Sequence, residues 1–268
     1  MPEIFANHAH VFPKEVKPEG TVDRLLHVMD ACDIARAVCF APFPERHAPA
    51  DFGARNWNQW LAREIAGEER LLGFGTVDFA VRNPVPTLQA AEIAILGLRG
   101  VKMHPAVQGI DLLGKEAREV YAAAEKLGLF VSFHTGLHWA RLRDYQPVLF
   151  DELNWDYPKL RFSMEHIGGY AFFRESMAVL ANGENGYAGW TSIEPGKGGV
   201  PGVWSLSNMD LCAVAYQLGP ERNIFGLDFP YKKKSDIKAA IERFNALPIS
   251  DEAKAGLFGE NLKKALRV

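Results

Sequence analysis

Residues 4–12 read Ile-Phe-Ala-Asn-His-Ala-His-Val-Phe, an apolar stretch that carries two histidines near its end. Such a run predicts a β-strand, in which side chains two residues apart point to the same face. The imidazoles of His8 and His10 are therefore expected to point the same way and to offer two nitrogen ligands to a metal ion. Taken alone, the pair is as compatible with a surface location as with a metal site.

Strand-like and helix-like segments alternate along the whole chain. The expected strands cover Ile4–Phe12, Ala37–Ala41, Leu71–Val77, Leu98–Met103, Leu129–His134, Leu160–His166, Gly186–Ile193 and Asn223–Leu227. The expected helices cover Thr21–Asp33, Ala54–Gly67, Pro84–Leu96, Lys115–Leu127, Gln146–Leu153, Ala171–Leu180, Val203–Leu218, Ser235–Leu247 and Asp251–Leu266. This alternation predicts βαβ units around a parallel sheet, whose buried strands read as continuous apolar runs.

Eight such units in 268 residues predict an α/β fold of the TIM-barrel type, a (β/α)8 barrel that forms a single domain over residues 1–268. A doubly wound open sheet is the alternative, but its G-x-G-x-x-G fingerprint does not follow the first strand. No linker or shift in composition divides the chain. The glycine-rich stretch 194–199 predicts a mobile loop, and it lacks the Ser or Thr of a phosphate-binding loop.

Composition narrows the classes of partner. The net charge is −3, and no basic stripe suggests nucleic acid. We expect no signal peptide and no membrane span. The three cysteines (Cys32, Cys39 and Cys212) are scattered, which predicts a reducing, cytoplasmic location and no disulfides. The expected partner is a small-molecule substrate, and a homodimer is left open.

Polar residues gather where the predicted strands end, which is where a TIM barrel builds its active site. Six of the eight histidines lie at or just beyond these ends: His8, His10, His104, His134, His138 and His166. Asp228 follows the last strand, and a buried acid without a partner would be costly there unless it meets a cation or a bound water. Strands one and eight are neighbours in a closed barrel and strand five lies across it, so their polar ends can converge. The ligand set expected for a zinc-like ion is His8, His10, His134 and Asp228.

These motifs, taken in order, resemble the amidohydrolase superfamily, and more narrowly its amidohydrolase 2 branch of metal-dependent hydrolases and nonoxidative decarboxylases. The matching strings are Asn7-His8-Ala9-His10, Gly100-Val101-Lys102-Met103-His104-Pro105, His134-Thr135-Gly136, His166-Ile167-Gly168-Gly169, Phe225-Gly226-Leu227-Asp228-Phe229-Pro230 and Gly259-Glu260-Asn261. The resemblance covers nearly the whole chain. One departure is Ala6, where the family usually has an Asp two residues before the first metal-binding His.

The resemblance implies one divalent ion, zinc or else manganese, that lowers the pKa of a bound water and polarises a carbonyl group. It implies that Asp228, besides binding the ion, accepts the proton of that water. His166 is expected to be a second catalytic group that either donates a hydrogen bond to a developing oxyanion or shuttles a proton. The alternative for His166 is a core histidine bound to the backbone.

Binuclear relatives bridge two metals with a carboxylated lysine on strand four, the position of Lys102. Since no second cluster of ligands is visible, we expect one ion, with Lys102 as a structural residue or a contact to a substrate anion. The residues expected to bind substrate are Lys102, His104, His138, Trp139, Arg141 and Trp190. His47, in the loop after the second strand, is also placed to reach the barrel mouth.

The expected activity is metal-dependent hydrolysis of a small anionic or aromatic amide, ester or lactone. No G-x-S-x-G motif is present, and no cysteine lies beside a histidine at a strand end, so no other nucleophile competes with water. The close alternative is zinc-dependent nonoxidative decarboxylation of an aromatic or muconate-type carboxylic acid. A third is an inactive barrel that serves as a binding module.

Overall fold

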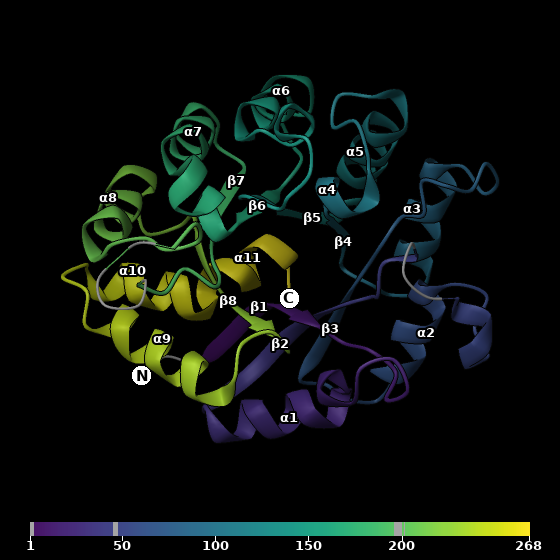
Figure 1. Ribbon diagram of the computed structural model, residues 1–268, viewed down its shortest axis with the longest axis horizontal. Coiled ribbons are helices and arrows are strands. Elements are labelled where there is room, and N and C mark those ends of the chain that lie inside the picture. The colour runs from purple at the N-terminus through teal and green to yellow at the C-terminus, as the bar shows by residue number, and fades with distance from the viewer. Residues whose placement is uncertain (1–2, 45–47, 196–199, 201) are drawn as a thin grey trace.

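A computed structural model shows a closed barrel of eight parallel strands, ordered around the barrel as they occur in the sequence (Figure 1). It describes residues 3–44, 48–195, 200 and 202–268. The strands are β1 (Ile4–His10), β2 (Ile34–Phe40), β3 (Leu71–Gly75), β4 (Gly100–Met103), β5 (Phe130–His134), β6 (Phe162–Glu165), β7 (Gly186–Trp190) and β8 (Asn223–Phe229). The expected TIM barrel is confirmed.

Helices follow the strands and cover the outside of the barrel (Figure 1). The α-helices are α1 (Val22–Ala31), α2 (Trp57–Glu64), α3 (Pro86–Ile95), α4 (Pro105–Gln108), α5 (Lys115–Leu127), α6 (Asp151–Asp156), α7 (Gly169–Asn182), α8 (Asn208–Leu218), α9 (Lys234–Asn245), α10 (Asp251–Ala255) and α11 (Asn261–Leu266). Short 3-10 segments are η1 (Pro18–Gly20), η3 (Pro49–Phe52), η4 (Leu142–Asp144), η5 (Pro147–Phe150) and η6 (His166–Gly168), and η8 (Gly256–Glu260) is a π-helical turn.

Aromatic side chains from β2, β3 and β5 fill part of the interior of the barrel. The ring centroids of Phe40 and Phe74 are 5.6 Å apart, and those of Phe74 and Phe130 are 5.8 Å apart. Leu262 and Leu266 of α11 belong to the same buried cluster, and α11 lies over the centre of the barrel (Figure 1). The aliphatic core between the strands and the outer helices forms a second, larger cluster. The opposite end of the barrel, where the strands finish, is left for a site.

Three predicted helices differ from those observed. The helix expected over 146–153 is a 3-10 segment, η5, followed by α6. The helix expected over 203–218 begins only at Asn208, because Ser207 and Asp210 form a capping box there. The helix expected over 251–266 is divided into α10, η8 and α11. Gly259 explains the break, since a Cβ at this position would approach the backbone of Glu3 and Phe5 to 3.0 Å. The chain bends at Gly259 so that it can pack closely on the start of β1.

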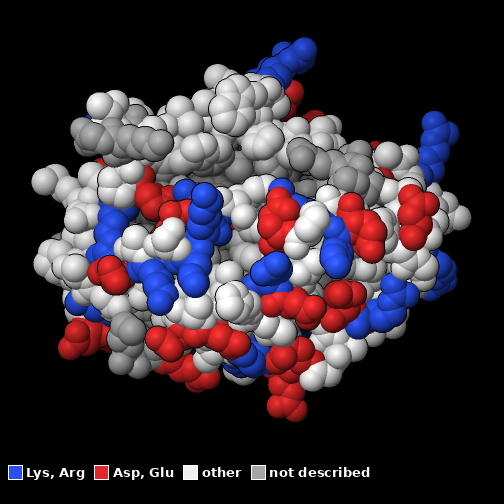
Figure 2. Space-filling view, turned by 60° about the horizontal axis from the view of Figure 1, so that its bottom comes forward, with Lys and Arg blue, Asp and Glu red and all other residues white. Residues whose placement is uncertain are grey.

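The surface carries both signs of charge. Figure 2 shows Lys and Arg side chains interspersed with Asp and Glu over the face in view, without a patch of one sign. No helix among the described residues is long and apolar enough to cross a membrane. The expected loop at 194–199 lies largely outside the described residues, as does His47.

Candidate metal centre and active site

His8 and His10 at the end of β1 and Asp228 near the end of β8 form a group that could hold a metal ion, because their ligand atoms all lie within 4.8 Å of one another. The Nε2 atoms of His8 and His10 are 3.1 Å apart. His8 Nε2 is 3.5 Å from Asp228 Oδ1. Two ligands on a tetrahedral zinc ion, each about 2.1 Å from the metal, lie roughly 3.4 Å apart. The spacing of these three side chains therefore fits one such ion.

The backbone at this group is not a regular strand. His8 has a φ of 66° and Asp228 a φ of 52°, in the left-handed region that side chains other than glycine seldom adopt. The register between β1 and β2 shifts between Ala6 and Ala9. The two imidazoles thus meet through a local irregularity and not through the simple alternation expected from the sequence. Strained backbone of this kind concentrates at functional sites.

Glu165, the last residue of β6, supports His8 from within the barrel. Its Oε2 lies 2.9 Å from His8 Nδ1 and accepts a hydrogen bond from Thr191 Oγ1 at 2.8 Å. Its Oε1 accepts from Asn7 Nδ2 at 2.8 Å and from the hydroxyls of Ser132 and Ser163. A carboxylate at Nδ1 keeps the proton there and leaves the Nε2 lone pair of His8 free for a cation.

Two glycines make room for this buried carboxylate and for the two side chains bound to its Oε2, those of Thr191 and His8. A Cβ at Gly189 of β7 would come within 2.6 Å of Glu165 Oε2. A Cβ at Gly226 of β8 would collide with Thr191 and lie 3.1 Å from the Cβ of His8. Sequence reasoning gave Glu165 no role, because the adjacent His166 was the more conspicuous residue. The sequence feature that could have identified Glu165 is an acidic residue at the end of an apolar strand, together with glycines in the strands that follow it.

His166 follows Glu165 and also has a left-handed backbone, with a φ of 66°. Its Nδ1 lies 2.8 Å from the carbonyl oxygen of Thr191, which can only accept, so Nδ1 carries the proton and donates. Burial lowers the pKa of His166 to about 4. Near neutral pH the ring is thus uncharged and its Nε2 is a proton acceptor. Of the two roles expected for His166, this tautomer favours proton transfer over donation to an oxyanion.

His104 and His134, at the ends of β4 and β5, form the other side of the site. Their rings are stacked, with centroids 3.8 Å apart and planes 9° from parallel. His104 Nδ1 and His134 Nε2 are buried without a hydrogen-bond partner, and burial lowers the pKa of both groups well below the usual value. His134 does not join His8, His10 and Asp228 in the compact group. A buried nitrogen lone pair without a donor nevertheless fits a site that receives a cation.

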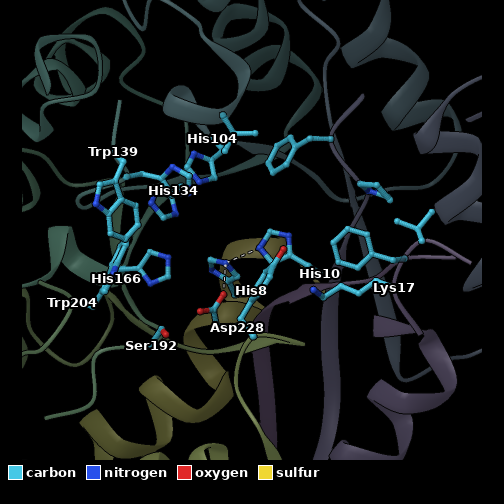
Figure 3. Close-up of a pocket in the computed structure, with 17 residues that line it drawn as sticks. His8, His10, Lys17, His104, His134, Trp139, His166, Ser192, Trp204 and Asp228 are labelled. Carbon is cyan, nitrogen blue, oxygen red and sulfur yellow. Dashed lines mark hydrogen bonds and ion pairs between the residues drawn. The ribbon is translucent and has the colours of Figure 1, made fainter. Parts of the chain in front are cut away.

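The candidate ligands open into a cavity of about 420 Å³ at the end of the barrel (Figure 3). Its described lining is rich in histidine and in aromatic and apolar side chains: His8, His10, Phe12, Val16, Lys17, Pro42, Phe43, His104, Val107, His134, His138, Trp139, His166, Ser192, Trp204, Asp228 and Tyr231. Lys17, Trp204 and Tyr231 were not expected from the sequence, because they lie in loops without a recognisable motif.

Three of the residues expected to bind substrate do not line this cavity. Lys102 is fully buried, with its Nζ 4.9 Å from the centre of the Phe40 ring and without a hydrogen-bond partner. Trp190 is also fully buried, and its Nε1 donates to Asn223 Oδ1 at 3.0 Å. Arg141 is exposed at the start of η4. None of these three side chains belongs to the described lining, and the burial of Lys102 agrees with the structural role that was one of its two expected roles. His104, His138 and Trp139 do line the cavity.

Comparison with known proteins agrees with this architecture. A family profile described as amidohydrolase (the amidohydrolase 2 family) matches residues 7–268. No sequence among the curated proteins matches the chain.

Three solved structures share the fold. The first is 5-carboxyvanillate decarboxylase from Sphingomonas paucimobilis, with a TM-score of 0.75, 16% identity and 100% of both chains covered. The second is a protein of Pseudomonas putida assigned as a putative 2-pyrone-4,6-dicarboxylic acid hydrolase, with a TM-score of 0.71, 21% identity, and 100% of this chain and 98% of that chain covered. The third is dihydroxybenzoic acid decarboxylase from Polaromonas sp. JS666 with bound manganese and the inhibitor 2-nitroresorcinol, with a TM-score of 0.69, 16% identity, and 100% of this chain and 97% of that chain covered. At these identities the likeness concerns the fold.

Proposed function

We propose that this chain, which belongs to the amidohydrolase family, is a metal-dependent hydrolase. The observation that carries the proposal is the group of His8, His10 and Asp228, whose donor atoms are spaced for one ion. His134 is proposed as a further ligand, because its Nε2 is buried without a partner beside the same cavity. Nitrogen and carboxylate ligands suit zinc, and manganese is the alternative, as bound in one relative of the same fold.

A divalent ion in this group supplies a Lewis acid, which lowers the pKa of a water and polarises a carbonyl oxygen. Side chains of the protein are proposed to carry out the proton transfers. Asp228 is proposed to accept the proton of the attacking water, since its carboxylate lies beside His8 at the cavity wall. His166 presents an unprotonated Nε2 to the same cavity, and it is proposed to take this proton from Asp228 and then to donate it to the leaving group, which returns Nε2 to its unprotonated state. Glu165 acts behind His8 as a positioning residue.

The proposed substrate is a small anionic or aromatic amide, ester or lactone. A cavity of about 420 Å³ accommodates a molecule the size of a substituted ring. Trp139, Trp204 and Tyr231 give it flat walls. The pyrone dicarboxylic acid named for the relative from Pseudomonas putida is a cyclic ester of this kind.

Nonoxidative decarboxylation of an aromatic or muconate-type acid is the second candidate. Decarboxylases appear among the structures that share this fold, and the aromatic walls suit a benzoate as well as a lactone. Here His166 or Asp228 would deliver a proton to carbon. A barrel that only binds ligands is less consistent with a group of three donors, one of which, His8, contacts a glutamate that four other side chains hold by hydrogen bonds.

Isotopes distinguish the two reactions. The zinc- or manganese-loaded protein is offered a panel of lactones, aryl amides and esters, and hydroxybenzoates, with acid release and CO2 release scored separately. In oxygen-18 water, hydrolysis of the best substrate places the label in the acid product. Carbon-bound deuterium formed in heavy water together with stoichiometric CO2 would overturn the hydrolase assignment.

A further inference from the structure

Lys17 supplies the cavity with a positive charge that neither the proposed metal group nor the proton-transfer residues account for. Among the lining residues that the structure describes, it is the single lysine, and no arginine accompanies it. Asp228 is the single carboxylate of that lining and is committed to the metal group. The cations expected from the sequence do not line the cavity, because Lys102 is buried within the barrel and Arg141 is exposed outside it. An anionic substrate entering this cavity therefore meets one ammonium group, that of Lys17.

The backbone holds Lys17 in a closed loop between β1 and α1. Its N–H donates to Pro13 O at 3.0 Å, and its carbonyl oxygen accepts from Gly20 N at 2.9 Å. Phe12 N donates in turn to Gly20 O at 2.9 Å, which ties the loop back to the end of β1. Gly20 has no space for a Cβ, which would come within 2.8 Å of the Phe12 ring and 3.2 Å of Pro230. The position of Lys17 is thus set before any ligand arrives.

The side chain of Lys17 runs toward the proposed metal group. Its Nζ lies 5.0 Å from the centre of the Tyr231 ring, and the Tyr231 ring centre lies 5.5 Å from that of His10. Figure 3 shows Lys17 beside His10, across the cavity from Trp139 and Trp204. An aromatic face under an ammonium group stabilises its charge and leaves its N–H bonds directed elsewhere. All three side chains, those of Lys17, Trp139 and Trp204, line the cavity of about 420 Å³, which is large enough for a substituted ring.

The ion pair between Lys17 and Glu19 is weak enough for a substrate carboxylate to replace Glu19. Glu19 Oε1 lies 3.4 Å from Lys17 Nζ, and the Glu19 side chain is 63% exposed. Exposed pairs of this kind contribute about 0–1 kcal/mol. A carboxylate held inside the cavity, away from bulk water, is a stronger partner for the same ammonium group.

We propose that Lys17 is a specificity-determining residue, which binds a carboxylate of the substrate other than the group that reacts at the metal. The inference rests on the proposed function, because it takes this cavity as the substrate site, and it narrows the substrate class. The substrate would be a flat ring that carries at least one carboxylate in addition to its reacting group.

Equilibrium binding tests this directly. The probes are benzene-1,3-dicarboxylate and its monoamide, 3-carbamoylbenzoate, which share one shape and differ by one negative charge. Binding to the zinc-loaded protein is followed by calorimetry at low ionic strength. The dicarboxylate should bind wild type about tenfold more tightly than the monoamide, as expected for one charge-assisted hydrogen bond. In Lys17→Met this preference should vanish, because the monoamide keeps its affinity and the dicarboxylate loses its advantage.

Two further variants separate a charge effect from a packing effect. Lys17→Arg should restore the preference for the dicarboxylate, and the exposed Lys14→Met, which removes a neighbouring charge outside the cavity, should leave it unchanged. Equal affinities of the two probes for wild type, a preserved preference in Lys17→Met, or failure of both probes to bind would each overturn the proposal. The experiment measures binding and not turnover, so its result can be interpreted even if the protein is not a hydrolase. Conversely, equal affinities for the two probes would not contradict the hydrolase assignment.

Discussion

His8 and His134 both lie at the C-terminal end of a barrel strand and face the same cavity, but their rings are held in different ways. His8 Nδ1 is bound to Glu165, which four other side chains hold in turn. His134 stacks flat on His104 and has a buried Nε2 without a partner. The side formed by β1, β6 and β8 is thus oriented by hydrogen bonds in advance, whereas the side formed by β4 and β5 relies on packing. We infer that the ligands on the first side contribute most of the affinity for the metal, and that His134 on the second side contributes less.

The largest effect is expected for His10→Ala. Loss of a ligand on the oriented side should leave no retained ion and lower activity on the order of a thousandfold or more. His134→Ala should also lower metal occupancy sharply, but its affinity for zinc should stay at least about tenfold above that of His10→Ala. Metal analysis and zinc competition titrations check this order. Full occupancy in His134→Ala would remove His134 from the ligand set, and equal affinities of the two variants would refute the contrast between the two sides.

His166→Asn separates proton transfer from metal binding on the oriented side. The amide of Asn can still donate to Thr191 O, but it cannot take up a proton. Metal content should therefore stay at the wild-type level while kcat falls about a hundredfold, as for other acid–base groups. Loss of the ion from this variant would make His166 a ligand, and normal activity would make it a structural residue.

The pH dependence of stability tests the burial of the same ring. The pKa of His166 is about 4 in the folded protein and 6.5 when exposed, so the unfolded chain binds an extra proton between these values. Metal-free protein should therefore lose stability as the pH falls from 6.5 toward 4, with His166 contributing about 3 kcal/mol of the loss. Denaturant melts of His166→Asn should show a loss smaller by about that amount. The exposed His27→Asn is the control and should follow wild type; parallel curves for all three proteins would contradict the assignment.

Glu165→Gln tests the support behind His8. The amide keeps the size of the side chain but weakens its hold on the Nδ1 proton of His8. Removing such a partner costs metal-binding proteins roughly 10–100-fold in affinity. Zinc competition should show this loss with the folded structure retained, as judged by circular dichroism. Wild-type affinity in Glu165→Gln would mean that packing alone orients His8, as it does His134.

The smallest effect is expected for Arg141→Ala. Arg141 is exposed and does not belong to the described lining, so kcat/KM on an anionic substrate should change less than about twofold, within the range of surface substitutions. A tenfold rise in KM would show that the η4 segment moves over the cavity.

The barrel could be predicted because each strand is a short apolar run between helical segments, and because histidines gather at the strand ends. What the sequence could not show is which way a residue near a strand end points. Trp190 and Glu165 sit near the ends of β7 and β6, yet Trp190 packs outward on Phe244 and Glu165 points inward at His8. The irregular backbone at His8, His166 and Asp228 removes the simple alternation on which such assignments rest.

The side-chain directions of Lys17, in a loop, and of Lys102, on β4, could not be predicted from the sequence either. Lys17 reaches the cavity through a turn closed by backbone hydrogen bonds to Pro13 and Gly20, which no composition rule reveals. Lys102 was expected at the cavity because it lies on β4, but it is buried over Phe40 inside the barrel. Burial lowers its pKa to about 8.

A zinc-edge anomalous difference map from crystals grown with zinc tests the central claim most directly. The account predicts one peak per chain, with His8 Nε2, His10 Nε2 and an oxygen of Asp228 about 2.0–2.2 Å from it, and with Glu165 still bound to His8 Nδ1. A peak held by His104 and His138 instead, a second peak beside Lys102, or no peak at full zinc saturation would contradict it.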